Sequence, residues 1–176
     1  MKILGLDSSG IVASVAIVED ENLIAEYTVN YKKTHSQTLL PMLDELVKMT
    51  ELDLDTIDAI AVAAGPGSFT GLRIGSATAK GLGLALKKPL VEIPTVDALA
   101  YNLYDSRALI CPIMDARRSQ VYTGIYRFQE HKLVTVEAQM AVPMAEMIEK
   151  LNARGEEVVF LGDGVPVFGK MIQENL

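Results

Sequence analysis

Two aspartates stand where an apolar run gives way to a polar turn. Asp7 is followed by Ser8 and Ser9, and Asp115 ends a second apolar run. A carboxylate beside hydroxyl groups at such a turn can hold a metal–phosphate complex, and two turns facing each other across a cleft would do so better. The same residue types also build ordinary solvated hairpin turns. The two aspartates therefore leave a nucleotide site and a plain turn open.

A glycine-rich segment, GPGSFTGLRIG, occupies Gly65–Gly75. A turn of this kind between a buried strand and a helix presents backbone N–H groups to an anion. The segment has neither the Gly-Lys-Ser/Thr ending of a Walker loop nor the G-x-G-x-x-G spacing of a dinucleotide fingerprint. A tight turn followed by a closely packed helix is the favoured interpretation, and anion binding is the alternative.

The composition limits the classes of function. Of the 176 residues, 16 are Lys or Arg and 23 are Asp or Glu, which gives a net charge of −7. Nucleic-acid binding by this chain alone is not expected, because phosphate contacts need clustered cations. Two histidines and one cysteine are too few for a zinc site or an internal disulfide. No apolar stretch is long enough to span a membrane, so the expected location is the cytoplasm. No bound metal is expected.

Hydrophobic periodicity predicts alternating strands and helices. The predicted strands are Lys2–Asp7, Ile11–Val18, Asn22–Val29, Ile57–Ala64, Pro89–Ile93, Ala108–Met114, Gln120–Phe128, Leu133–Ala138 and Glu157–Leu161, and the predicted helices are Thr34–Lys48, Gly71–Lys87, Thr95–Tyr104 and Pro143–Leu151. One order occurs twice: strand, Asp-bearing turn, two strands, helix, strand, glycine-rich turn. We therefore predict two lobes, 1–106 and 107–176. The second copy is the shorter, so we expect the native polypeptide to continue beyond Leu176.

The helices predicted at 34–48 and 71–87 carry more apolar or small positions than one buried face requires. The second has small residues at every fourth position, which share one face. We predict that the two helices together form a partner-binding surface made of Leu39, Met42, Leu43, Leu46, Gly71, Gly75, Ala79 and Gly83. The alternative is that the small residues pack against the protein's own sheet.

Four segments together resemble the bacterial TsaB family, also called YeaZ: ILGLDSSG, THSQTLLPML, AAGPGSFTGLRIG and MDARRSQVY. The resemblance implies an α/β, actin-like fold of two duplicated βββαβα lobes, the second incomplete here. It also implies a non-catalytic scaffold that binds and activates a paralogue, TsaD. TsaD places a threonylcarbamoyl group on the adenosine next to the anticodon in tRNAs that read codons beginning with A.

The resemblance further implies a heterodimer with TsaD, joined by the small ATPase TsaE. It implies tRNA contact only through that complex and a homodimer as an option for the isolated chain. Active actin-like kinases have an Asp-x-Gly turn where this chain has Asp115-Ala116-Arg117, which argues against catalysis. The implied vestigial nucleotide site comprises Asp7, Ser8, Ser9, Asp115, Gly162, Asp163 and Gly164. No cofactor is expected, although weak nucleotide binding stays open. The alternatives are an active actin-like ATPase or kinase and, from an older glycoprotease label, a metallopeptidase.

Overall fold

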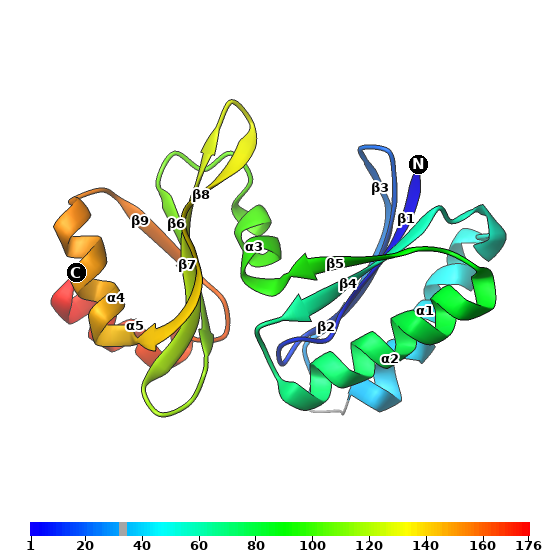
Figure 1. The fold of residues 1–176 in the computed structure, drawn as a ribbon, viewed down its shortest axis with the longest axis horizontal. Helices are drawn as coiled ribbons and strands as arrows, with labels where there is room; N and C mark the ends of the chain where they lie inside the picture. Colours follow the sequence, from blue (N-terminus) through cyan, green and yellow to red (C-terminus); the bar gives the residue numbers. More distant parts are fainter. Residues whose placement is uncertain (32–34) are drawn as a thin grey trace. The chain divides into compact units, whose positions relative to one another are not determined.

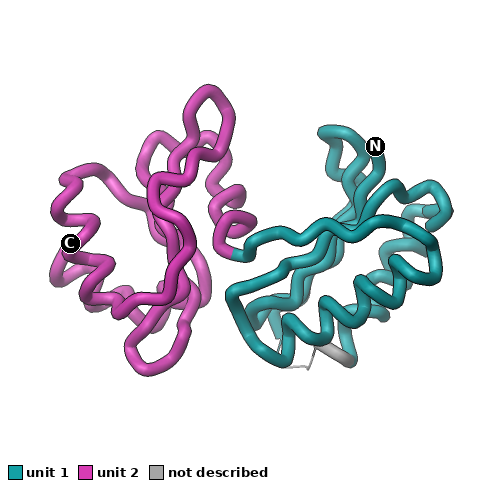
Figure 2. The backbone as a smooth tube through the Cα atoms, viewed as in Figure 1, with its two compact units in different colours: residues 1–95 teal, residues 96–176 magenta. Residues whose placement is uncertain are grey.

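The computed structural model of the chain describes residues 1–31 and 35–176 and divides into two compact units (Figures 1 and 2). Unit 1 is Met1–Thr95 and unit 2 is Val96–Leu176. Among the described residues, no helix has the length and apolar character needed to cross a bilayer.

Unit 1 is a five-stranded sheet with two long helices on one face (Figure 1). Its elements are β1 (Lys2–Asp7), β2 (Ala13–Glu19), β3 (Asn22–Val29), α1 (His35–Thr50), the short 3-10 helix η1 (Leu54–Thr56), β4 (Ala59–Gly65), α2 (Phe69–Leu86) and β5 (Leu90–Pro94). The strand order is β3-β2-β1-β4-β5, with β1 antiparallel to β2 and parallel to β4. The predicted start of α1, Thr34, lies outside the described residues.

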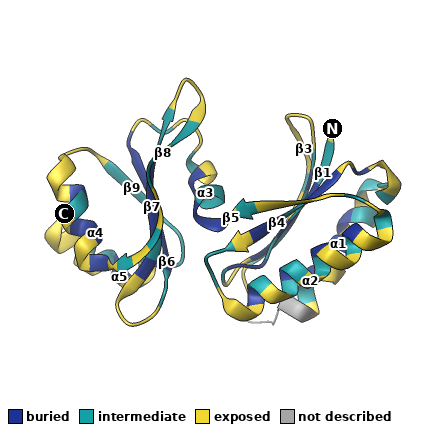
Figure 3. Cartoon of the chain, in the orientation of Figure 1, coloured by how far each residue is buried: buried dark blue, intermediate teal, exposed yellow. Residues whose placement is uncertain are grey.

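The core of unit 1 follows from the alternation of side chains along its strands. Leu4 and Leu6 of β1, and Val15 and Ile17 of β2, are at most 4% exposed. They belong to the same apolar cluster as buried residues of α1 and α2, so the helices cover that face of the sheet. In Figure 3, buried residues are coloured dark blue, and they appear on the strands of unit 1 and on both of its long helices.

Unit 2 repeats the βββαβα order of unit 1. Its elements are α3 (Thr95–Ala100, which starts at the last residue of unit 1), the 3-10 helix η2 (Tyr101–Leu103), β6 (Leu109–Asp115), β7 (Gln120–Gln129), β8 (Lys132–Pro143), α4 (Met144–Arg154), β9 (Val158–Leu161) and α5 (Val165–Asn175). The sheet order is β8-β7-β6-β9, with β6 antiparallel to β7 and parallel to β9. The duplicated α/β fold class is thereby confirmed.

The boundary between the units precedes the one predicted at residue 106, because α3 packs into unit 2. Val96 and Ala100 are fully buried and share a cluster with Ile110 and Tyr126. The Tyr126 hydroxyl donates a 2.6 Å hydrogen bond to Asp97 Oδ1. Burial of the ring, together with this bond, raises the pKa of Tyr126. The helix is thus anchored to the second sheet by both packing and a partly buried hydrogen bond.

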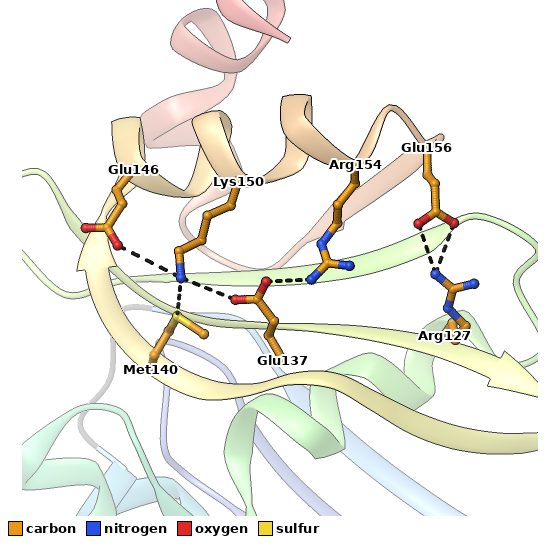
Figure 4. Close-up of polar contacts among 7 residues, drawn as sticks. All are labelled: Arg127, Glu137, Met140, Glu146, Lys150, Arg154 and Glu156. Atoms are coloured by element: carbon orange, nitrogen blue, oxygen red, sulfur yellow. Dashed lines mark hydrogen bonds and ion pairs between the residues drawn. The ribbon is translucent and has the colours of Figure 1, made fainter.

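Ion pairs fasten α4 to the outermost strand of unit 2 (Figure 4). The carboxylate of Glu137 on β8 accepts hydrogen bonds from Arg154 at 2.6 Å and from Lys150 at 3.3 Å. The bond from Arg154 is the main cause that lowers the pKa of Glu137, and Lys150 adds to it. Nearby, one guanidinium nitrogen of Arg127 lies 3.0 Å from both carboxylate oxygens of Glu156. The two hydrogen bonds to Glu137 complement the apolar packing of α4.

Candidate functional site

The first Asp-bearing turn is closed by its own hydrogen bonds. Asp7 Oδ1 accepts from the Ser9 backbone N–H at 2.8 Å and from the Ser9 hydroxyl at 2.6 Å. The buried Ser8 hydroxyl donates to the backbone oxygen of Gly71 at 2.9 Å. Asp7 therefore stabilises the turn, and Ser8 joins that turn to the first turn of α2.

The glycine-rich loop lies directly against this turn. The Ser68 N–H donates to the backbone oxygen of Ser9 at 2.6 Å. A Cβ atom placed on Gly67 would come within 2.3 Å of the same oxygen, so a side chain has no room there. Ser68 also begins α2 as its N-cap, because its hydroxyl accepts from the Gly71 N–H at 3.3 Å. Close backbone packing is thus a sufficient reason for Gly67.

The second Asp-bearing turn has an arginine at a position whose backbone conformation favours glycine. Arg117, Arg118 and Ser119 all have positive φ, at 67°, 51° and 60°. The Arg117 N–H donates to Asp115 Oδ1 at 2.9 Å, and its guanidinium lies 3.6 Å from Asp115 Oδ2. A positive φ costs about 1 kcal/mol or more for a residue other than glycine. Arg117 therefore takes up a conformation that suits glycine and pairs with the carboxylate of its own turn.

The Gly162-Asp163-Gly164 turn meets this second turn within unit 2. Asp163 Oδ1 accepts from the Asp115 N–H at 3.1 Å. Gly162 has φ +105°, and a Cβ on it would lie 2.3 Å from the backbone oxygen of Ile113. Gly164 donates to that oxygen at 3.0 Å. The structure thus brings the four predicted residues of this half-site together. A joint site with Asp7 of unit 1 stays a prediction.

The predicted partner surface is wrong, because its residues lie in the core of unit 1. The four residues named on α1, namely Leu39, Met42, Leu43 and Leu46, are each at most 4% exposed. The four named on α2 form its buried face, and they are Gly71, Gly75, Ala79 and Gly83. The alternative interpretation holds: the glycines let α2 approach the sheet. A Cβ on Gly75 would meet Ser8 Oγ at 2.6 Å and the side chain of Val62 at 3.7 Å.

The opposite side of α2 carries a set of exposed residues that the sequence analysis missed. Phe69 is 69% exposed and Leu84 is 83% exposed. Arg73 and Lys80 lie between them in sequence and are also exposed. Because the four are spaced by four, seven and four residues, they share one side of the helix. We call them the outer α2 surface. The guanidinium of Arg73 lies 4.2 Å from the centre of the Phe69 ring, a cation–π contact.

A hollow of about 460 Å³ lies beside this surface, between α2 and the strands β4 and β5. Its apolar wall includes Val62 to Ala64 of β4 and Leu72 of α2. Ser76 and Ala77 also line the hollow, and their small side chains do not fill it. Arg73, Lys80 and Glu92 also line it. The hollow therefore combines an apolar wall with groups of both charges.

Within the described ranges, no three His, Cys, Asp or Glu side chains gather closely enough to hold a metal ion. The single cysteine, Cys111, is fully buried in β6, and burial raises its pKa to about 11. Its sulfur lies 3.4 Å from the Thr123 hydroxyl. A buried protonated thiol fits a structural residue and not a nucleophile. The expectations of no metal and no cofactor stay predictions.

The βββαβα order that occurs twice, with one mixed sheet in each unit, is that of the duplicated, actin-like class of α/β proteins. Within that class, a family model described as "TsaD: tRNA N6-adenosine threonylcarbamoyltransferase" matches residues 22–176. A solved structure described as YeaZ from Pseudomonas aeruginosa aligns with a TM-score of 0.73 and 31% identity, covering 81% of this chain and 66% of that one.

Comparison with individual relatives identifies the family within this class. The chain is 36% identical over 176 residues to the Bacillus subtilis tRNA threonylcarbamoyladenosine biosynthesis protein TsaB, covering all of this chain and 77% of the relative. It is 30% identical over 167 residues to the Escherichia coli TsaB protein, covering 93% and 72%. The chain belongs to the TsaB (YeaZ) family. Its role is in tRNA threonylcarbamoyladenosine biosynthesis.

Proposed function

We propose that this chain is a non-catalytic subunit that binds a TsaD-type transferase through the outer α2 surface and thereby supports tRNA modification. The observation that carries the proposal is the exposure of Phe69 and Leu84 on one side of a long helix. Large apolar side chains that stay exposed along one side of a helix offer a partner its anchor points. Leu40 of the neighbouring helix α1 is also 53% exposed and can extend the contact.

The proposal includes that the two Asp-bearing turns do not catalyse nucleotide hydrolysis or phosphoryl transfer. In an active actin-like kinase, the second turn leaves backbone open to phosphate. Here the Arg117 side chain takes the glycine position and lies beside Asp115. Asp163 already accepts the Asp115 N–H. A nucleotide would have to displace these contacts, so we expect at most weak binding and no turnover.

The remaining parts of the proposal follow from the family role. The partner is a TsaD protein, with a TsaE ATPase in the larger assembly, and tRNA is contacted only through that assembly. The net charge of −7 is consistent with indirect contact to tRNA. We place the protein in the cytoplasm, where tRNA is modified. In the absence of TsaD, the outer α2 surface can pair two copies.

Calorimetric titration of the organism's own TsaD protein into wild type and Leu84→Asp tests the binding role. Loss of one well-packed apolar anchor costs about 2 kcal/mol, so we expect roughly 30-fold weaker binding. Leu23→Asp is the matched control, since Leu23 is 59% exposed on β3 of the same unit. It should bind as wild type. Equal affinity for Leu84→Asp and wild type would contradict the proposed surface.

An ATPase assay separates the proposal from an active kinase. The isolated chain should show no ATP turnover, and Asp115→Ala should change nothing. Turnover near one per second that disappears in Asp115→Ala, with Glu130→Ala as a surface control, would favour the kinase alternative. A peptidase activity lost on chelation would favour the metallopeptidase.

A further inference from the structure

We propose that the hollow between α2 and β5 receives a large apolar side chain of the partner that is flanked by a carboxylate. This inference rests on the proposed binding role and adds the chemistry of the occupant. The hollow measures about 460 Å³ and lies entirely within unit 1. It borders the outer α2 surface, because Phe69, Arg73 and Lys80 belong to both.

The shape of the hollow comes from the choice of residues on α2. Leu72, Ser76 and Lys80 recur at four-residue spacing on one side of the helix, and all three line the hollow. Ser76 is half-buried and Ala77 is exposed, and neither side chain is large enough to fill the space. The apolar wall consists of the last residues of β4. The wall therefore offers contact to an apolar group that enters from outside.

The charges around the hollow define what must accompany that group. Arg73 and Lys80 form no ion pair with any carboxylate in the described part of the chain. The guanidinium of Arg73 instead lies over the Phe69 ring, and both residues line the hollow. Glu92 of β5 is likewise without an ion pair among the described residues. Two cations against one carboxylate make this a positive spot on a chain of charge −7.

The arrangement fits a side chain from another protein better than a free small anion. A small anion would need polar groups that converge on the floor of a pocket. Here the wall of β4 is apolar, and the cations belong to the exposed side chains of Arg73 and Lys80 on α2. A partner segment can place its apolar side chain against that wall while a neighbouring Asp or Glu meets Arg73 or Lys80. Electrostatic complementarity of this kind also selects one partner over another.

Filling the hollow tests the inference. Ser76→Phe places a ring in the space, and Ala85→Phe, on an exposed position of the same helix outside the hollow, is the matched control. We expect Ser76→Phe to weaken binding of the TsaD protein at least tenfold and Ala85→Phe to leave it within twofold. Circular dichroism establishes that both variants fold. If Ser76→Phe does not fold, Ala77→Phe provides the same test from an exposed position.

Charge reversal tests the second half of the inference. Arg73→Glu combined with Lys80→Glu should weaken binding tenfold or more and invert its salt dependence, because added salt then screens a repulsion, whereas Lys132→Glu in unit 2 should have no effect. Unchanged binding by the folded Ser76→Phe and Ala77→Phe variants would overturn the inference. If Leu84→Asp still weakens binding in that case, the proposed function stands and only the occupied hollow is refuted. If none of these variants affects binding, both proposals fail.

Discussion

The contact between α2 and the first Asp-bearing turn gives a sharp prediction for Gly75. A methyl group at this position would lie 2.6 Å from Ser8 Oγ, well inside ordinary van der Waals distance. Ser8 cannot simply rotate away, because its hydroxyl is buried and donates to the Gly71 backbone oxygen. Gly75→Ala must therefore either compress this contact or break the hydrogen bond.

The magnitude follows from three opposing contributions. Overpacking a core position typically costs about 1–3 kcal/mol, and a displaced buried hydrogen bond costs about 1 kcal/mol more. Replacing glycine by alanine inside a helix returns about 1 kcal/mol. We expect Gly75→Ala to lower the free energy of unfolding by about 1–3 kcal/mol. Gly81→Ala is the matched control on the same helix, since nothing lies within 4 Å of its Cβ position.

Urea unfolding of the full chain, followed by circular dichroism, measures these changes. Gly75→Ala should have a lower midpoint than wild type, and Gly81→Ala should have an equal or higher one. Ser8→Ala removes the oxygen that clashes and leaves its Cβ 3.9 Å from the new methyl group. In the double variant, the two changes should compensate by about 1–2 kcal/mol relative to their sum. A Gly75→Ala protein as stable as Gly81→Ala would refute the packing argument.

Three further outcomes are expected from unit 2. The pKa of Glu137 is lowered by Arg154 and Lys150, so its stabilising effect is present above the unfolded pKa of about 4.3 and is lost as the pH falls through the lowered folded pKa. Glu137→Gln should unfold more easily than wild type in urea at pH 7, by about 1 kcal/mol, and this difference should shrink steadily as the pH is lowered below about 4.3. Cys111, with a pKa of about 11 and no exposure, should resist a thiol-specific reagent at pH 8 and react fully in 6 M urea, and fast labelling of the folded chain would contradict its burial. Gly162→Ala should lower the free energy of unfolding by more than about 2 kcal/mol, because its φ is +105° and its Cβ would strike a backbone oxygen of β6, and a wild-type melting curve would disprove the close approach.

The sequence by itself determined the local elements and their repeated order. The strands Lys2–Asp7 and Asn22–Val29 have the predicted bounds, because alternation and flanking turn residues are local signals. Where the bounds differ, tertiary pairing extended an element: β8 runs to Pro143, since it pairs with β7 along nearly its whole length. The helix α5 was not predicted, although Pro166 near its start is a typical signal.

The candidate nucleotide residues were also found from local chemistry, because Asp, Ser and Gly at strand ends stand out in a linear sequence. The contacts that these side chains make in the folded protein could not be predicted from the sequence. Only the structure places the Asp163 carboxylate on the Asp115 N–H, and the Arg117 guanidinium near the Asp115 carboxylate. The first contact joins residues 48 positions apart. Rules based on residue spacing in the sequence cannot predict a contact between residues this far apart.

The orientation of α2 was decided only by the tertiary structure. Its small residues and its exposed residues each recur at about one-turn spacing, so the periodicity defines two opposite faces without saying which one is buried. The buried face is the one that fits against Ser8 and Val62, where a glycine leaves room for another chain segment. Phe69 and Leu84 are exposed because no element in the described part of unit 1 covers that face. Periodicity fixes which residues share a face, whereas the shape of the opposing surface fixes which face is inside.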